Sequence, residues 1–170
     1  AGRGVGLGRG GGGRTLAVSS GGALRQSGVL AVAGASSFNA GATAITLPDG
    51  AHDFAGAVSL SNTGANDVAL TDASALVLGT VGVGQNLAVI SGGALTQSGV
   101  LTVAGTSSFN AGANAITLTD GSNDFSGAVS LSNTGANDVA LTDASALVLG
   151  TVGLGQNLAV ISGGALTQTG

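Results

Sequence analysis

The stretch NDVALTDASALVLGTVG fills residues 66–82 and recurs unchanged at residues 137–153, 71 positions further along the chain. The duplication extends well beyond these letters, since residues 38–99 and 109–170 differ at only seven of 62 positions. The seven pairs mostly exchange small residues of the kind found at turns and surfaces: Thr43/Asn114, Pro48/Thr119, Ala51/Ser122, His52/Asn123, Ala55/Ser126, Val83/Leu154 and Ser98/Thr169. Literal copying on this scale is typical of proteins that grow by stacking similar structural units.

Within each copy, short runs alternate between apolar residues and small or polar ones. In AITLTD at 115–120, Ile116 and Leu118 alternate with threonines, and DVALTD at 138–143 continues the same pattern. This period of two residues indicates β-strands with one buried face. Gly, Asn, Asp and Ser fill the gaps and supply turns, and no segment shows a sustained helical period. The sequence therefore predicts an all-β fold.

The composition allows a buried core, but only a thin one. Hydrophobic residues make up 44% of the 170-residue chain and charged residues 7%, which is unlike a highly charged disordered tail. Only 2% of the residues are aromatic, and the chain has no Trp, Tyr, Met or Cys, so Ala, Val, Leu and Ile must form the core in thin layers. No apolar run is long enough to cross a membrane. The absence of Cys fits either a reducing compartment or an exported bacterial protein.

A shorter period appears when the leucine that stands two positions before a Gln or an Asp is followed along the chain. These structural ladder leucines are separated by 23, 23, 25, 23, 23 and 25 residues: Leu24, Leu47, Leu70, Leu95, Leu118, Leu141 and Leu166. The pattern predicts a parallel β-helix, a solenoid of roughly seven coils with about 23–25 residues and three short strands per coil. Each strand would pair with its equivalent in the next coil, about 4.8 Å away. Three coils would make up one sequence copy.

The whole chain, residues 1–170, is interpreted as a single β-helical repeat region. Residues 1–28 would form degenerate first coils, and residues 29–99 and 100–170 would be the two full repeats of a longer array. No capping element follows the second repeat, and an uncapped β-helix exposes unpaired strand edges that are templates for further pairing. We therefore expect the chain to associate with itself by end-to-end stacking or to be part of a longer repeat array.

The N-terminal segment AGRGVGLGRGGGGRT at 1–15 admits a second interpretation. Its three arginines lie among glycines, as in tails that bind nucleic acid. Shifted by 71 positions, however, Val5 and Leu7 fall on Leu76 and Leu78, which favours a degenerate coil. Beyond Arg25 the chain has no Lys or Arg, so no nucleic acid partner is expected.

Residues able to perform catalysis do not recur between the copies. The single His52 is replaced by Asn123, and the sequence has no Cys nucleophile, recurring Ser/His/Asp set or His/Cys metal cluster. His52 is therefore interpreted as a satisfied or solvent-facing turn residue. The sequence predicts a protein that is not an enzyme and needs no cofactor.

A polar position two residues after the ladder leucine is the one candidate for a metal site. Asp49 and Asp72 should stack on adjacent coils, as should Asp120 and Asp143, and paired carboxylates can bind calcium when further oxygen ligands are near. The simpler alternative is solvated turn carboxylates, whose repulsion in water costs about 1 kcal/mol at this distance. We favour this alternative, without a metal. Pro48 cannot donate a ladder hydrogen bond, which predicts that the strand before it ends there.

Residues 84–150, GQNLAVISGGALTQSGVLTVAGTSSFNAGANAITLTDGSNDFSGAVSLSNTGANDVALTDASALVLG, carry a family resemblance. They resemble the β-strand repeats of very large bacterial exoproteins of the filamentous haemagglutinin and autotransporter-adhesin type, and the likeness extends over the chain from Leu16 onward. The resemblance implies a right-handed parallel β-helix, export across the outer membrane, and an extracellular or bacterial cell-surface location. It also implies a structural role as a stalk, adhesin or extracellular fibre, in cell adhesion or a biofilm matrix.

The alternative function is a surface-binding module, in which an outward face of the β-helix recognises glycans, such as cell-surface or matrix polysaccharide, or host and matrix surfaces. Sugar sites usually expose aromatic rings, whereas the four phenylalanines are interpreted as core fillers: Phe38, Phe54, Phe109 and Phe125. A flat ice-binding face is a third interpretation, but Arg25 and Pro48 interrupt its threonine column, which would contain Thr71, Thr96, Thr119, Thr142 and Thr167. The sequence favours the structural role.

Overall fold

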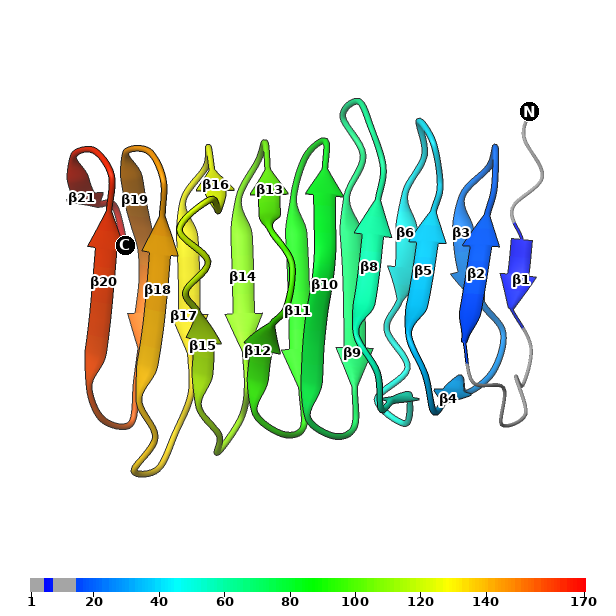
Figure 1. Ribbon diagram of the computed structural model, residues 1–170, viewed down its shortest axis with the longest axis horizontal. Helices are drawn as coiled ribbons and strands as arrows, with labels where there is room; N and C mark the ends of the chain where they lie inside the picture. Colours follow the sequence, from blue (N-terminus) through cyan, green and yellow to red (C-terminus); the bar gives the residue numbers. More distant parts are fainter. Residues whose placement is uncertain (1–4, 8–14) are drawn as a thin grey trace.

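The structure, a computed structural model, describes residues 5–7 and 15–170, with side chains from residue 15 onward. The chain forms a parallel β-solenoid of about 8 stacked coils, which lie side by side along the long axis in Figure 1. The described residues form strands and turns but no helix, and so no helix among them could cross a membrane. The predicted all-β parallel β-helix is confirmed.

Two main sheets face each other across the core, and their strands run in opposite directions in Figure 1. The nine-stranded sheet contains, in spatial order, β1 (Val5–Leu7), β3 (Leu24–Gln26), β6 (Ile45–Leu47), β9 (Val68–Asp72), β11 (Leu87–Ser91), β14 (Ser107–Asn110), β17 (Val129–Ser132), β19 (Leu147–Gly153) and β21 (Leu166–Gln168). The ten-stranded sheet contains β2 (Leu16–Ser19), β5 (Ser36–Asn39), β8 (Val58–Ser61), β10 (Leu76–Val83), β12 (Leu95–Gln97), β15 (Ile116–Leu118), β18 (Val139–Asp143) and β20 (Leu158–Ser162), with β13 (Leu101–Val103) and β16 (Asp124–Phe125) beside this row. A separate two-stranded sheet pairs β4 (Ala31–Val32) with β7 (Asp53–Phe54).

Each coil contributes one strand to each main sheet, because the two sheets alternate along the chain. The strand pairs are parallel, and paired residues lie 19 to 23 positions apart, as Val5 with Leu24 and Ile45 with Val68 illustrate. Most coils are therefore shorter than the predicted 23–25 residues, and there are about 8 of them where roughly seven were expected. Among the described residues, a third short strand is present at only four places, as β4, β7, β13 and β16.

One 71-residue copy makes three and a half coils, because it contains seven main strands: β5, β6, β8, β9, β10, β11 and β12. Since seven is odd, equivalent strands of the two copies lie in opposite sheets. Leu24 in β3 belongs to the nine-stranded sheet, whereas its equivalent Leu95 in β12 belongs to the ten-stranded sheet. The prediction of three coils per copy is wrong by half a coil, because the 25-residue step from Leu70 to Leu95 passes through three strands rather than two.

The ladder leucines do not form one continuous column. The pairings are Leu24 with Ile45, Leu47 with Leu70, Leu95 with Ile116, and Leu118 with Leu141. Positions two apart in a strand point to the same face, so Leu24 can pair with Ile45 in place of Leu47 and no side chain turns outward. The ladder leucines are at most 1% exposed except Leu166, which lies in the last coil and is 50% exposed.

Apolar side chains from both main sheets meet in one core that runs the length of the solenoid. All four phenylalanines are fully buried, which confirms that they fill the core. They pack in two T-shaped pairs, Phe38 with Phe54 at 5.9 Å between ring centroids and Phe109 with Phe125 at 6.0 Å. Burying a side chain of this size stabilises a fold by ~1.5–3 kcal/mol. The equivalent phenylalanine pairs therefore stabilise the two copies to a similar extent.

Some turns stack so closely that only glycine fits. Gly64 has a φ of 71°, a backbone conformation that other residues rarely adopt. In the next coil, a Cβ added to Gly84 would overlap the carbonyl oxygen of Gly64. The spacing of the coils at this turn therefore depends on the absence of a side chain.

The last coil is covered on one side only. Leu158 in β20 is 37% exposed and Leu166 in β21 is 50% exposed, whereas their equivalents Leu87 and Leu95 are 1% and 0% exposed. The difference arises because β14 and β15 pair with the strands that hold Leu87 and Leu95 and cover them.

Candidate functional site

Polar side chains gather where the turn after β6 meets its neighbouring coils, and again after β15. The first cluster is defined as Gln26, His52, Asp53, Asp72 and Ser74, and the second cluster as the equivalent residues Gln97, Asn123, Asp124, Asp143 and Ser145. Each cluster joins three successive coils. Because a copy makes three and a half coils, the main strands of the first cluster, β3 and β9, belong to the nine-stranded sheet, and those of the second, β12 and β18, belong to the ten-stranded sheet.

His52 is fully buried and bonded at both ring nitrogens. Its Nδ1 accepts a hydrogen bond of 2.9 Å from the backbone N–H of Leu30, and its Nε2 faces the side-chain oxygen of Gln26. Nε2 therefore carries the ring proton and donates a hydrogen bond to the side-chain oxygen of Gln26. The ring also packs beside Phe54, with centroids 5.6 Å apart. The prediction of a satisfied histidine is confirmed, and the side chain connects two coils.

Asn123 performs the same task in the second cluster without an aromatic ring. Its Oδ1 accepts hydrogen bonds from the backbone N–H of Leu101 at 3.0 Å and from Nε2 of Gln97 at 2.9 Å. Its Nδ2 donates to Oε1 of Gln97 at 2.9 Å. The exchange of His52 for Asn123 thus preserves the bond to the backbone of the preceding coil.

Asp72 and Asp143 are buried acceptors for backbone groups, with exposed fractions of 2% and 1%. In the first cluster, Oδ1 of Asp72 accepts from the N–H of Phe54 at 2.9 Å, and Oδ2 accepts from the N–H and hydroxyl of Ser74 at 3.2 and 3.1 Å. Asp143 makes the equivalent three bonds in the second cluster. These donors replace the water that a buried carboxylate loses. The expectation that these two side chains are solvated turn carboxylates is therefore wrong.

Asp49 and Asp120 cap their own turns at the ends of β6 and β15. Asp49 accepts from the backbone N–H of Ala51 at 3.0 Å, and Asp120 from that of Ser122 at 2.9 Å. β6 ends at Leu47, directly before the exposed Pro48, as the proline predicted.

The carboxylates of Asp49 and Asp72 do not form a shared site. Asp72 accepts hydrogen bonds from Phe54 and Ser74, whereas Asp49 accepts from Ala51 in its own turn. Within residues 5–7 and 15–170, no group of three or more His, Cys, Asp or Glu side chains is placed to hold a metal ion.

Burial shifts the titration of both ionisable groups in the core of the first cluster. Burial lowers the pKa of His52, and the charges of Asp49 and Asp72 offset this only in part. Burial raises the pKa of Asp72, while hydrogen bonds from Phe54 and Ser74 oppose the change and the charge of Asp53 adds to it. A neutral His52 agrees with its role as acceptor for the N–H of Leu30.

The hydroxyl of Ser74 lies between two carboxylates, 2.9 Å from Oδ1 of Asp53 and 3.1 Å from Oδ2 of Asp72. Ser145 lies between Asp124 and Asp143 in the same way. Asp53 and Asp124 were not singled out from the sequence, although the recurring DF and TDAS segments at 53–54, 71–74, 124–125 and 142–145 carry the signal. This arrangement connects coils through side-chain hydrogen bonds.

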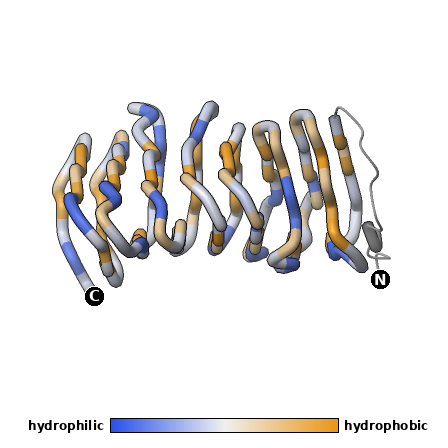
Figure 2. Tube along the Cα trace, turned by 90° about the horizontal axis from the view of Figure 1, so that it is seen from below, coloured by the Kyte–Doolittle hydropathy of each residue, from blue (hydrophilic) through white to orange (hydrophobic). Residues whose placement is uncertain are grey.

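The outward faces of both main sheets present mostly small side chains, with Ile90 and Ile161 as large exposed exceptions. On the nine-stranded sheet the outward column is Arg25, Thr46, Ala69, Ala88, Ser108 and Ser130, and beyond the register shift between β17 and β19 the next outward pair is Val148 and Thr167. On the ten-stranded sheet the outward column is Ala17, Ser37 and Ser59, and beyond the register shift between β8 and β10 it continues as Val77, Thr96, Thr117, Ala140 and Ala159. Figure 2 shows hydrophobic and hydrophilic segments interleaved along the coils. Arg25 is the one charged residue in these two columns.

The predicted threonine column is divided between the two sheets. Thr71 lies in β9 of the nine-stranded sheet, whereas Thr96 lies in β12 of the ten-stranded sheet. Thr142 is 8% exposed and therefore buried. A single flat threonine face, as ice binding would require, is not formed by these residues.

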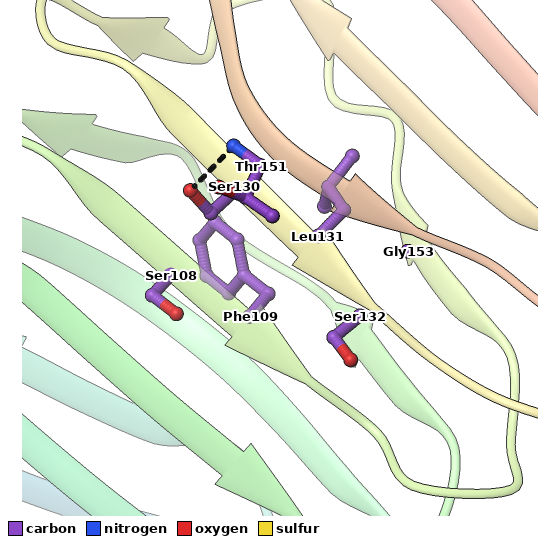
Figure 3. Close-up of a pocket in the computed structure, with 7 residues that line it drawn as sticks. All are labelled: Ser108, Phe109, Ser130, Leu131, Ser132, Thr151 and Gly153. Atoms are coloured by element: carbon purple, nitrogen blue, oxygen red, sulfur yellow. Dashed lines mark hydrogen bonds between the residues drawn. The ribbon is translucent and has the colours of Figure 1, made fainter. Parts of the chain in front are cut away.

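A shallow hollow of about 250 Å³ lies on the outer side of the nine-stranded sheet (Figure 3). Its lining is mostly hydroxyl-bearing and small: Ser108, Phe109, Ser130, Leu131, Ser132, Thr151 and Gly153. It forms where the pairing of β17 with β19 shifts register, and the N–H of Thr151 bonds to Oγ of Ser130 at 3.2 Å. The ring of Phe109 is fully buried, so this hollow offers hydroxyl groups but no exposed aromatic platform.

Comparison with known proteins identifies a repeat family. The family described as "Repeats of unknown function (DUF5649)" matches residues 1–61, 65–132 and 136–170. The second and third matches begin 71 positions apart, at residues 65 and 136, which is the period of the sequence repeat. No curated protein and no solved structure matches the chain.

Proposed function

The chain belongs to the DUF5649 family of repeats of unknown function, and from its geometry we propose that it is a structural module, a non-catalytic rod segment that lengthens by adding copies of its 71-residue unit. The observation that carries the proposal is the continuity of pairing from one copy to the next. Strand β11 pairs with β14 over four residues, and β12 pairs with β15, across the junction between the copies. The junction is thus built like the interior of a copy.

The polar clusters support a stiff rod. Gln26 and His52 are 26 positions apart in the sequence, and Phe54 and Asp72 are 18 apart, yet each pair is joined by a hydrogen bond. These bonds connect successive coils in addition to the strand pairing, so bending would have to break both kinds of contact.

Self-association is the partner interaction that we propose. The exposed Leu158 and Leu166 of the last coil would be buried by one more coil of the same kind, as Leu87 and Leu95 are buried by β14 and β15. That coil would come from a second copy of the chain stacked end to end or from a further repeat of a longer array. Exposed edges of this kind are templates for strand addition.

The setting that we propose is the bacterial surface or the extracellular matrix. Its support is the resemblance of residues 84–150 to the repeats of filamentous haemagglutinin and autotransporter-type adhesins. In this setting the rod would serve as a stalk, adhesin shaft or fibre, with the right-handed coiling that the resemblance implies.

Rod length tests the proposal directly. Chains with one, two and three additional copies of residues 100–170 should lengthen by roughly 17 Å per copy, since each copy adds three and a half coils at about 4.8 Å. Small-angle X-ray scattering or electron microscopy would measure the increment. An increase in diameter without this constant increase in length would contradict a rod that grows by stacking.

The hydroxyl-lined hollow supports a second candidate function, the recognition of a surface glycan by the outer face of the nine-stranded sheet. A glycan array probed with the whole chain tests it, together with the variant Thr151→Lys, which places a long charged side chain at the hollow. The control is Thr117→Lys, which places the same charge at an exposed site on the ten-stranded sheet. Binding that Thr151→Lys weakens and Thr117→Lys leaves unchanged would favour this function.

A further inference from the structure

We propose that the first cluster is an acid-sensitive latch, a set of contacts between the coil of β3 and β4 and the coil of β6 and β7 that loosens when His52 gains a second proton. The second cluster is its pH-insensitive counterpart, because Asn123 replaces the imidazole. The chain would then contain one coil junction that weakens in acid and an equivalent junction that does not.

The geometry requires an uncharged imidazole. Nδ1 of His52 accepts from the N–H of Leu30, and Nε2 already donates to Gln26. A proton on Nδ1 would point at the N–H of Leu30, so the hydrogen bond would be lost and two donors would face each other in a site that is fully buried. The contact between the coils cannot survive protonation unchanged.

The strand pairing beside the latch is too short to compensate for the loss of the hydrogen bond between Leu30 and His52. Strands β4 and β7 contain two residues each and pair only with one another. The N–H groups of Asp53 and Ala55 donate to the carbonyls of Leu30 and Val32 across the same junction. Loss of the bond from Leu30 to His52 therefore acts beside a strand pairing of only two residues.

Several charged groups surround the imidazole. Asp49 lies in the same turn, Asp53 follows in β7, Asp72 lies in β9, and Arg25 is exposed on the outer face of β3. The carboxylates of Asp49 and Asp72 favour the protonated ring, but burial disfavours it more strongly. Asp72 is also held by Phe54 and Ser74, so it cannot turn toward a charged His52 without giving up those bonds.

The direction of the pH effect follows from the lowered pKa of His52. A group whose pKa is lower in the folded state stabilises the fold fully above its unfolded pKa, which is about 6.5 for histidine, and this contribution is lost as the pH falls through the folded pKa. The latch is therefore closed at neutral pH and loosens in mild acid.

Hydrogen exchange on the whole chain tests the proposal, with amide protection measured at pH 7.5 and pH 5 and corrected for intrinsic exchange. Protection of the Leu30 amide should fall by several-fold at pH 5, up to the ceiling of ~30-fold set by an unfolded pKa of 6.5. Protection of the Leu101 amide, bonded to Asn123, should stay the same. Equal changes at Leu30 and Leu101, or no change at Leu30, would overturn the proposal.

Two variants exchange the central residues of the two clusters, His52 and Asn123. His52→Asn installs an arrangement that the second copy already contains, so it should fold and should abolish the pH response at Leu30. Asn123→His should create the response at Leu101. If the response at Leu30 persists in His52→Asn, it arises from Asp72 or another carboxyl group, and the latch is rejected. This comparison decides the matter even if Asn123→His fails to fold.

Discussion

The side-chain amides of Gln97 and Asn123 lie on neighbouring coils and exchange two hydrogen bonds, each of 2.9 Å. Asn123 also accepts from the N–H of Leu101 and donates to the carbonyl of Thr142, so one buried side chain touches three coils. Such a network is stable because each buried group has a partner, and removal of one member leaves the others unpaired.

Asn123→Ala should lower the free energy of unfolding by about 2–4 kcal/mol, because the buried N–H of Leu101 loses its partner and Gln97 loses both of its bonds to Asn123. Urea unfolding followed by circular dichroism would measure the change. Thr117→Ala in the adjacent β15, where the side chain is exposed, is the control and should change stability by less than about 0.5 kcal/mol. Equal effects of the two substitutions would show that the network carries no special stability.

Ser107→Ala should stabilise the protein. The hydroxyls of Ser107 and its equivalent Ser36 are buried and have no hydrogen-bond partner, and an unpaired buried hydroxyl costs about 1–3 kcal/mol. Thermal and urea unfolding should therefore show a gain of about 1 kcal/mol. The neighbouring Ser108→Ala, at an exposed position, should be neutral. A loss of stability in Ser107→Ala would mean that the hydroxyl has a partner after all.

Gly84→Ala should destabilise the solenoid by about 1–3 kcal/mol, since the new Cβ would meet the backbone of Gly64 and push two coils apart. Gly82 is two residues away and has open space where its Cβ would be. Gly82→Ala is thus a matched control, and its stability should stay close to that of the unchanged chain. The prediction fails if the two variants unfold at the same urea concentration.

Leu158→Lys combined with Leu166→Lys should suppress self-association. Both leucines are exposed on the open side of the last coil, and two charges there would oppose the docking of another apolar coil. Analytical ultracentrifugation should show concentration-dependent assembly of the unchanged chain and a shift to monomer in the double variant. Thr102→Lys with Thr117→Lys, both at exposed sites within the stack, provides a control of equal charge. A chain that is monomeric before any substitution would contradict end-to-end stacking.

The fold class could be predicted from the sequence because strand alternation and turn residues are local signals. The register could not, since Ile45 and Leu47 are both apolar and both face the core, and either can pair with Leu24. Counting leucines therefore placed Leu70 and Leu95 one coil apart, although one and a half coils separate them.

In the polar clusters, too, the sequence predicted what depends on neighbouring residues but not what depends on contacts between coils. A satisfied His52 could be inferred from its replacement by Asn123. The burial of Asp72 could not, because it depends on the N–H of Phe54, which is 18 residues away in sequence and faces Asp72 only after the coils have stacked. Roles that arise from contacts between coils become visible only once the register is known.

The half-coil in each copy gives the rod a two-fold screw axis along its length. Moving along the chain by one copy turns the molecule by half a revolution, so Ile90, which is 49% exposed on the nine-stranded sheet, reappears as Ile161, which is 66% exposed on the ten-stranded sheet. Two copies, 142 residues, are needed before the same residue returns to the same side. A rod made of this unit is therefore two-sided, and whatever binds one broad face finds an equivalent site on the reverse, displaced by roughly 17 Å along the axis.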